Sequence, residues 1–218
     1  MNLVDCRDCP RLVAWREQTA REKRAAFRDE TYWGRPVPSF GEERALILLV
    51  GLAPAAHGGN RTGRMFTGDR SGDFLYRALH AAGLANQPDS IAIDDGLTLI
   101  GCRVTAAVRC APPANKPTPA EIEQCSQWLL PELAIERRVV VALGAIAFRA
   151  VLRLAPRLGW LLPRPLPKFG HGAEVAVDKG PRLLASYHPS QQNTFTGKLD
   201  QEMLVAVLRR AAAVAGFA

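Results

Sequence analysis

The sequence predicts an α/β protein of three layers, α/β/α, in which helices cover both faces of a central four-stranded parallel sheet. Four short apolar runs are typical of buried strands, and three of them are joined through segments with helical patterning. The 218 residues contain no convincing linker, repeat or low-complexity tract. We therefore expect a single domain over residues 1–218.

The first half of the chain alternates helical and strand-like patterns. Residues 11–27 carry loosely periodic apolar positions that predict a helix, and residues 31–41, with two prolines and two glycines, predict a loop. The apolar run 45–50 predicts the first strand. A helix is expected over 73–82, and residues 97–108, rich in β-formers, predict the second strand.

The second half continues the same alternation after an irregular segment. Three prolines within 111–118 exclude regular structure there, because proline lacks the donor that a strand ladder needs. Thr118-Pro-Ala-Glu121 is a capping box with proline at the first helical position, which predicts a helix over 119–134. The remaining strand, helix, strand and helix are expected at 138–143, 145–154, 182–187 and 200–215.

Composition and charge limit the classes of partner. No apolar stretch approaches the length of a membrane span, and the first residues lack the basic and apolar regions of an export signal, so we expect a cytoplasmic protein with no membrane partner. The net charge of +7 favours a polyanionic partner such as nucleic acid. A solvated basic surface is the alternative explanation.

A glycine-rich turn follows the first predicted strand directly. It runs from Gly51 to Asp69 and therefore begins at the carboxyl edge of the sheet, where open α/β folds bind ligands. Small residues allow backbone N–H groups to approach a ligand closely, and His57, Phe66 and Asp69 follow within the turn. A glycine-rich connection without a ligand is the alternative.

Four of the five cysteines form two pairs that are typical of a metal site. Cys6 and Cys9 are separated by two residues, whereas Cys110 and Cys125 come from a strand exit and from the following helix. Without an export signal, disulfides are not expected. The spacing suits zinc or a four-iron cluster and does not separate them. Cys102, within a strand, is expected to be a buried apolar residue.

Several sequence blocks together resemble the family 5 uracil-DNA glycosylases, the iron–sulfur type. They occupy residues 6–13, 51–54, 57–58, 60–64, 66–69, 105–113, 115–119, 185–188, 192–194 and 196–197. The resemblance implies removal of uracil and other deaminated bases from DNA, a three-layer α/β fold, and a structural [4Fe-4S] cluster on Cys6, Cys9, Cys110 and Cys125. Two departures are visible, Ala55 in place of glycine and Met65 in place of proline.

Excision of uracil requires that the base first leave the base stack of the DNA and enter a pocket of the enzyme. Polar and aromatic side chains in and near the glycine-rich turn are candidates to line that pocket. Phe66 is expected to stack on the base, and His188 to donate a hydrogen bond to the base oxygen where negative charge builds. Asp69, with Asp73 as the competing choice, is expected to orient water or stabilise the sugar cation. Asn115 is expected to read the amide edge of the base.

Further residues are expected to bind substrate or DNA. Related four-cysteine enzymes carry Asn after the Thr of the second strand, where this chain has Ala106, so we expect a roomier pocket that also accepts hypoxanthine. Gln191, Gln192 or Phe195 could fill the gap left by the base, and His171 could face the site. The other expected contacts are Gly51, Ala53, Ala55, His57 and Asn60 for the base, and Arg61, Arg64, Ser190, Gln191, Gln192 and Asn193 for DNA.

Two other functions are compatible with parts of this pattern. One is a non-catalytic nucleic-acid-binding module held together by a four-cysteine metal site. It explains the charge and the cysteines, but it does not explain why Asp69, Asn115 and His188 all follow predicted strands. A phosphate-binding enzyme would use the glycine-rich turn as an anion cradle, but the turn lacks Gly-Lys-Ser/Thr and the spaced glycines of a dinucleotide site. We expect a monomer.

Overall fold

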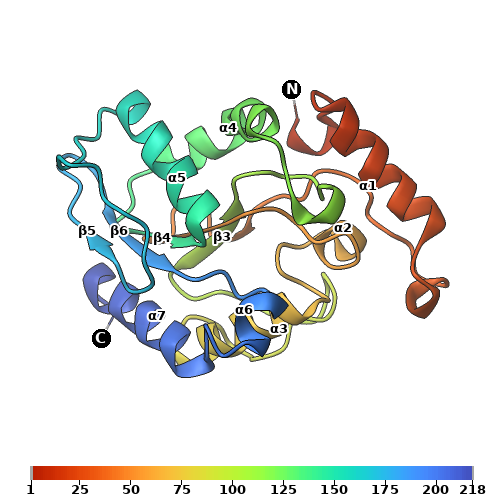
Figure 1. The fold of residues 1–218 in the computed structure, drawn as a ribbon. Coiled ribbons are helices and arrows are strands. Elements are labelled where there is room, and N and C mark those ends of the chain that lie inside the picture. Colours follow the sequence, from red (N-terminus) through yellow and green to blue (C-terminus); the bar gives the residue numbers. More distant parts are fainter. Residues whose placement is uncertain (1, 218) are drawn as a thin grey trace.

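The computed structural model describes residues 2–217 and places a twisted sheet between two layers of helices (Figure 1). Within these residues the strand order is β1-β3-β2-β4-β6-β5. The four inner strands are mutually parallel, which confirms the predicted sheet. Their bounds are β2 Ile47–Gly51, β3 Cys102–Ala106, β4 Val139–Leu143 and β6 Arg182–Ser186.

Two short antiparallel strands extend the predicted sheet at its edges. β1 (Phe40–Gly41) pairs with β3, and β5 (Glu174–Val175) pairs with β6. The prolines and glycines of residues 31–41 predict a loop where the structure has β1. A two-residue strand carries no alternating pattern that could distinguish it from a loop, which is why both edges were missed.

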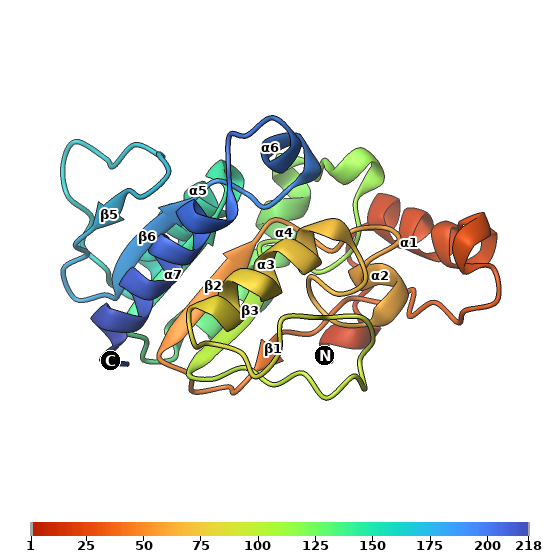
Figure 2. The same cartoon turned by 90° about the horizontal axis from the view of Figure 1, so that it is seen from below.

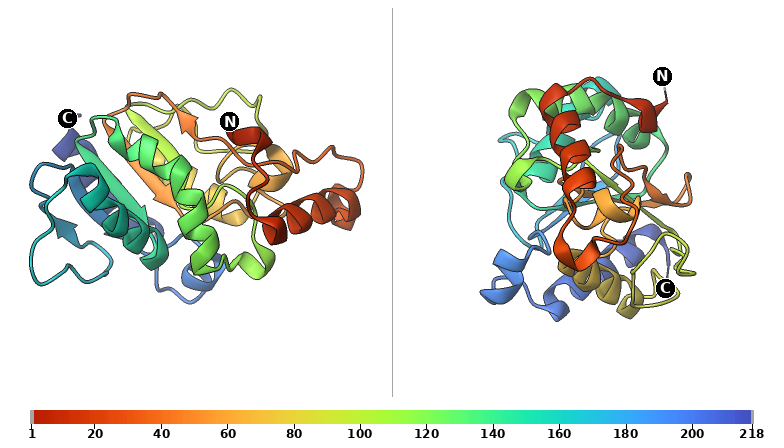
Figure 3. Two further views of the ribbon diagram at one scale, coloured as in Figure 1. Left: turned by 90° about the horizontal axis from the view of Figure 1, so that it is seen from above. Right: turned by 90° about the vertical axis from the view of Figure 1, so that its right-hand side faces the viewer.

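The two faces of the sheet bury alternate residues of the same strand. On β2, Ile47 and Leu49 pack toward α3 (Arg70–Ala81) and α7 (Gln201–Ala215), whereas Leu48 and Val50 pack toward α4 (Pro119–Ala134) and α5 (Ala145–Leu154). Figure 2 shows the α3 and α7 layer in front of the sheet, and the left view of Figure 3 shows the α4 and α5 layer. Burial on both faces explains the continuous apolar runs.

Helix ends follow the capping residues in the sequence. α4 begins at Pro119 after the predicted capping box of Thr118 and Glu121 and ends at Ala134, as expected. Asp200 caps α7 by accepting a hydrogen bond from the Met203 N–H. α3 begins three residues earlier than expected, because Asp69 caps it through the Gly72 N–H.

Two predicted elements are shorter than the sequence pattern indicates. The helix expected over 11–27 is α1 (Pro10–Glu22), followed by a separate 3₁₀ turn at Ala25–Phe27. Lys23 has a φ of 54°, which no α-helix can continue. The strand expected over 97–108 is restricted to Cys102–Ala106, since the preceding Gly101 has a φ of 63° and interrupts extended backbone.

The N-terminal segment lies at the side of the sandwich (right view of Figure 3). α1 contacts α2 (Gly59–Thr62) and places Leu12 in a small cluster with Val108, Cys110 and Cys125. Among the described residues, no helix is both long and apolar enough to cross a bilayer.

Candidate active site

A cleft of about 580 Å³ opens where the loops after β2, β3 and β6 meet. These loops leave the carboxyl ends of parallel strands, and they therefore converge at one edge of the sheet. Nine residues expected from the sequence line the cleft: Ala53, Ala55, Phe66, Asp69, Asn115, His188, Ser190, Gln191 and Gln192. Leu52, Pro54, Ser71, Ala114 and Lys116 complete the lining and were not foreseen.

Phe66 forms an aromatic wall of this cleft. Its side chain is 7% exposed, and its φ of 54° places a non-glycine residue in the left-handed region. Such backbone is uncommon and persists only where the surrounding structure enforces it. A β-carbon built at Gly51 would come within 2.7 Å of the Phe66 ring, so the absent side chain at position 51 lets the ring lie against the strand end. Gly51 thus supports the ring and is not itself a lining residue.

Asp69 contributes a buried carboxylate to the cleft. Its Oδ1 atom accepts a hydrogen bond of 2.9 Å from the Gly72 N–H at the start of α3. Burial raises the pKa of this carboxyl above its ordinary value of 3.8, although the backbone N–H groups oppose the shift. A β-carbon at Gly58 would collide with the carboxylate, which explains that glycine. Asp73, the competing choice, is exposed and outside the cleft lining.

His188 faces Phe66 across the cleft. The two ring centroids are 5.9 Å apart and the ring planes are inclined by 33°. The imidazole lies two residues after the end of β6 at Ser186 and is followed by Pro189. Burial lowers the pKa of His188 from 6.5 to about 4, since a charged imidazolium loses solvation there. The side chain is therefore a neutral imidazole at physiological pH, with one N–H to donate.

Asn115 and Lys116 form the rim contributed by the proline-rich loop after β3. Ala114 and Asn115 have φ values of 51° and 55°, so two successive residues adopt left-handed backbone in the 3₁₀ turn Pro113–Asn115. The Asn115 side chain is exposed at the cleft. Asn tolerates this conformation better than most residues, whereas Ala does not. The backbone strain at this rim therefore falls mainly on Ala114, next to the predicted reading residue Asn115.

Arg61 and Arg64 are buried, which corrects the expectation that they contact DNA. Their side chains are only 9% and 3% exposed. Arg61 pairs with Glu30 and donates to the carbonyls of His57 and Gly68. The sequence does not reveal whether an arginine side chain faces solvent or a buried acceptor. Here the guanidinium of Arg61 donates to acceptors within the protein.

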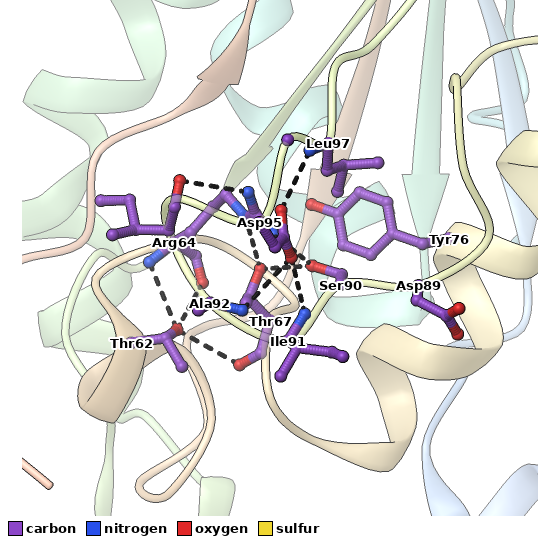
Figure 4. Close-up of polar contacts among 12 residues, drawn as sticks. Thr62, Arg64, Thr67, Tyr76, Asp89, Ser90, Ile91, Ala92, Asp95 and Leu97 are labelled. Atoms are coloured by element: carbon purple, nitrogen blue, oxygen red, sulfur yellow. Dashed lines mark hydrogen bonds and ion pairs between the residues drawn. The ribbon is translucent and has the colours of Figure 1, made fainter.

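The Arg64 side chain joins the turn after β2 to the loop before β3 (Figure 4). Its guanidinium donates to Thr67 at 2.9 Å, to Ser90 at 2.9 Å and to the Asp95 carboxylate at 2.6 Å. Asp95 also accepts from the backbone N–H groups of Ile91, Ala92 and Leu97. Burial opposes ionisation of Asp95, but the hydrogen bond from Arg64 and then these backbone hydrogen bonds lower its pKa. Arg64 precedes Phe66 by two residues, and the network therefore fixes the turn that carries the aromatic wall.

Four other predicted residues lie outside the cleft lining. Asn60 is fully buried and donates to the Arg16 carbonyl at 3.2 Å, whereas His57 hydrogen-bonds through Nδ1 to the Tyr32 hydroxyl at 3.0 Å. Asn193 donates to the His188 carbonyl at 2.8 Å and so braces the backbone beside the imidazole. His171 accepts from the Tyr187 N–H and lines a separate pocket beside α7. The contacts of these four side chains lie within the protein, and their role in the structure is to stabilise the fold.

The two predicted cysteine pairs meet beside the cleft. Cys6, Cys9, Cys110 and Cys125 all line one small cavity between α1 and α4, together with Leu12, Arg109 and Trp128. Cys102 lies elsewhere, buried in β3, and its S–H donates to the Leu84 carbonyl. The fifth cysteine is thus separate from the other four, as its position within a strand predicts.

The chemistry of the cysteine cavity fits a group that binds four thiolates. Burial raises the pKa of Cys9 to about 11 and that of Cys125 to about 12, so these sulfurs stay protonated unless a cationic centre holds them. The Arg16 guanidinium donates to Cys110 Sγ at 2.9 Å, and the Arg109 N–H donates to Cys125 Sγ at 3.3 Å. Within residues 2–217, no three His, Cys, Asp or Glu side chains converge tightly enough to hold a single metal ion.

The fold and the cleft define an α/β enzyme that can hold a planar ring against Phe66, beside one carboxylate and one neutral imidazole. The family model of the uracil DNA glycosylase superfamily matches residues 38–212, a span that begins two residues before β1 and ends within α7. The match includes Phe66, Asp69, Asn115 and His188 and excludes the first cysteine pair.

Relatives match almost the whole chain. A type-5 uracil-DNA glycosylase of Thermus thermophilus is 56% identical over 216 residues, covering 98% of this chain and 95% of its own. Proteins of the same description from Mycobacterium bovis and Pyrobaculum aerophilum are 56% and 51% identical, covering 97% and 98% of this chain and 78% and 91% of their own. The chain belongs to the uracil DNA glycosylase superfamily and, within it, to the type-5 enzymes.

Proposed function

We propose that this protein is a DNA-repair glycosylase that hydrolyses the N-glycosidic bond of uracil flipped out of DNA. The observation that carries the proposal is the convergence of Phe66, Asp69 and His188 on one cleft, in a chain whose type-5 relatives bear the name uracil-DNA glycosylase. An enzyme cannot reach this bond inside the duplex, so the base must rotate into such a cleft.

His188 stabilises the departing base. As the bond from C1′ to N1 breaks, negative charge grows on the base oxygens, and a donor placed there binds the transition state more strongly than the ground state. Burial lowers the pKa of His188 to about 4, so the imidazole is neutral. A neutral imidazole still has one N–H that can donate a hydrogen bond to the base. One preorganised donor of this kind accelerates a reaction by about 100- to 1,000-fold.

Asp69 acts at the sugar. Positive charge develops on the deoxyribose as the base leaves, and an ionised carboxylate both stabilises that charge and orients the attacking water. Oδ1 is held by the Gly72 N–H at the start of α3, which fixes the orientation of the carboxylate. The raised pKa of Asp69 brings the carboxyl closer to the range in which it can accept a proton from water.

The base itself is recognised by stacking and by amide hydrogen bonds. Phe66 supplies the stacking surface, and the exposed Asn115 offers a paired donor and acceptor for the amide edge of uracil. Two small side chains, Ala53 and Ala55, also line the cleft. Together with Ala106 in the place of a larger Asn, they favour excision of hypoxanthine beside uracil. Ala106 is buried in the same apolar cluster as Phe66, so its effect on the cleft would be indirect.

The DNA backbone is expected to cross the rim of the cleft. Lys116, Ser190, Gln191 and Gln192 line the cleft, and such hydrogen-bond donors suit contacts to phosphate and sugar oxygens. Phe195, on α6 (Gln191–Phe195), is 66% exposed, with the Arg70 guanidinium above its ring. Phe195 and the two glutamines are the side chains placed to fill the space that the rotated base leaves.

A [4Fe-4S] cluster on Cys6, Cys9, Cys110 and Cys125 is the cofactor we propose, with zinc as the alternative. The cavity between α1 and α4 is lined by four cysteines, which is the number of thiolates that a cubane cluster takes. When bound, the cluster would supply no step of the hydrolysis, since all its positions are taken by protein. These cysteines would tie the N-terminal residues to β3 and α4.

A duplex with one uracil tests the function. Incubation with the purified protein, followed by cleavage of abasic sites with alkali, should give a single shortened strand from the uracil duplex and a fainter one from a hypoxanthine duplex. Variants of Asp69, Asn115 and His188 should lose product without losing DNA binding. Binding with no cleavage of any deaminated base would identify the non-catalytic module instead. Iron and zinc analysis of the same preparation tests the cofactor.

A further inference from the structure

Arg16 is a buried cation beside the cysteine cavity. The residue is 2% exposed on α1, and its guanidinium donates through Nη1 to Cys110 Sγ at 2.9 Å and through Nη2 to the Cys6 carbonyl at 3.1 Å. The third donor, Nε, is buried without an acceptor within the described residues. Both protein acceptors of Arg16 thus belong to residues that line the cavity.

Three other arginines, Arg11, Arg64 and Arg109, have carboxylate partners. Arg11, one turn earlier on α1, pairs with Glu121 at 2.7 Å, and the buried Arg64 pairs with Asp95 at 2.6 Å. Arg109, which lines the cavity, lies 3.5 Å from Glu132. The ion pairs found among residues 2–217 do not include Arg16. A guanidinium remains charged in proteins, so its burial requires a negative group nearby.

We propose that Arg16 is the built-in counter-cation of the four-cysteine centre and raises its reduction potential. The proposal rests on the cluster proposed above. Four thiolates on a doubly charged cubane carry about two net negative charges, and uptake of one electron from an external reductant adds a third. A hydrogen bond to a ligand sulfur and a fixed positive charge both favour the more negative state.

Two further residues of the cavity lining carry unpaired donors. The indole Nε1 of Trp128 and Nε of Arg109 are buried without an acceptor within the described residues. Unpaired buried donors are costly, and a negatively charged group in this cavity would offset part of that cost. Arg16 differs from both, because it alone combines a contact to a ligand sulfur with the lack of a carboxylate.

The test compares Arg16→Lys, Arg16→Gln and the control Arg21→Gln with wild type. Arg21 is exposed on the same helix and lies away from the cavity lining. Each holoprotein is analysed for iron per chain, titrated anaerobically with dithionite to obtain the midpoint potential, and exposed to air while the visible absorbance of the cluster is followed. Circular dichroism reports the fold of each variant.

The expected result is a more negative midpoint and faster bleaching in air for Arg16→Gln, with Arg16→Lys closer to wild type and Arg21→Gln unchanged. Loss of iron in Arg16→Gln but not in Arg16→Lys supports the same conclusion, because the positive charge at position 16 is then what keeps the iron bound. Equal midpoints in all variants, or equal iron loss in Arg16→Lys and Arg16→Gln, would overturn it. Wild type that contains zinc and no iron refutes the cluster instead, a distinguishable outcome.

Discussion

The ring of Phe66 lies directly against the backbone of Gly51, so close that a β-carbon at position 51 would come within 2.7 Å of two ring atoms. The sheet itself therefore sets the position of the aromatic wall. Because the strand end is rigid and buried, it cannot move away from an added methyl group, and the Phe66 ring would have to shift into the cleft.

Gly51→Ala should reduce excision of uracil more than it reduces stability. The methyl group pushes Phe66 into the cleft, and overpacking of this kind costs about 1–3 kcal/mol of unfolding free energy. Steady-state kinetics and urea unfolding measure the two effects. Gly170→Ala is the matched control, since that position has open space and no positive φ. Unchanged kinetics in Gly51→Ala would show that the ring position does not matter.

Asp69→Asn should abolish most activity while leaving the fold intact. Asn is a good helix cap and preserves the hydrogen bond from Gly72, but it cannot carry the negative charge required at the sugar. We expect a loss of kcat of at least about 100-fold. Asp73→Asn, at an exposed position one turn later, should retain wild-type kcat. Equal losses in the two variants would refute the assignment to Asp69.

His188 should give the folded protein a pH-dependent stability that His188→Asn lacks. Its pKa is about 4 in the folded state and 6.5 as the reference value. The folded state disfavours the proton, so this contribution is complete above pH 6.5 and is lost as the pH falls toward 4. Urea unfolding of wild type and variant at several pH values measures the difference, which should shrink with acidification. A constant difference would contradict a buried neutral imidazole.

The same pKa predicts the shape of the activity profile. No ionisation near pH 6.5 should appear in kcat/KM on account of His188, because the imidazole is already neutral there. The acid limb should reflect Asp69 instead, at a pH above the ordinary carboxyl value, since protonation removes the required charge. Activity therefore rises with pH through the raised pKa of Asp69. An acid limb centred at or below the ordinary carboxyl value of 3.8 would contradict the assignment to Asp69.

Asp95→Ala should destabilise the protein strongly although Asp95 lies outside the cleft lining. The substitution leaves the buried Arg64 guanidinium without its counter-charge, which typically costs about 3–5 kcal/mol. Glu123→Ala removes an exposed partner of Arg153 and should cost less than about 1 kcal/mol. Chemical unfolding distinguishes them. Similar small effects for both would show that the network in Figure 4 does not anchor the turn.

Much of the fold follows from local sequence patterns. The capping box of Thr118 and Glu121 set the start of α4, and the apolar runs of β2 and β4 identified buried strands, because caps and burial act over a few neighbouring residues. The edge strands were missed because two residues carry no period. The end of α1 at Lys23 was missed because its positive φ leaves no mark in the sequence.

The sequence by itself determined which kinds of side chain gather at the carboxyl edge of the sheet: Phe66, Asp69, Asn115 and His188 were all expected there, since parallel strands end at one edge. Only the tertiary structure decided which charges are available to a ligand. Arg61 and Arg64 lie in the same turn as Phe66, yet they are buried against Glu30 and Asp95. Burial depends on partners distant in the chain, and such partners are not visible in a local pattern.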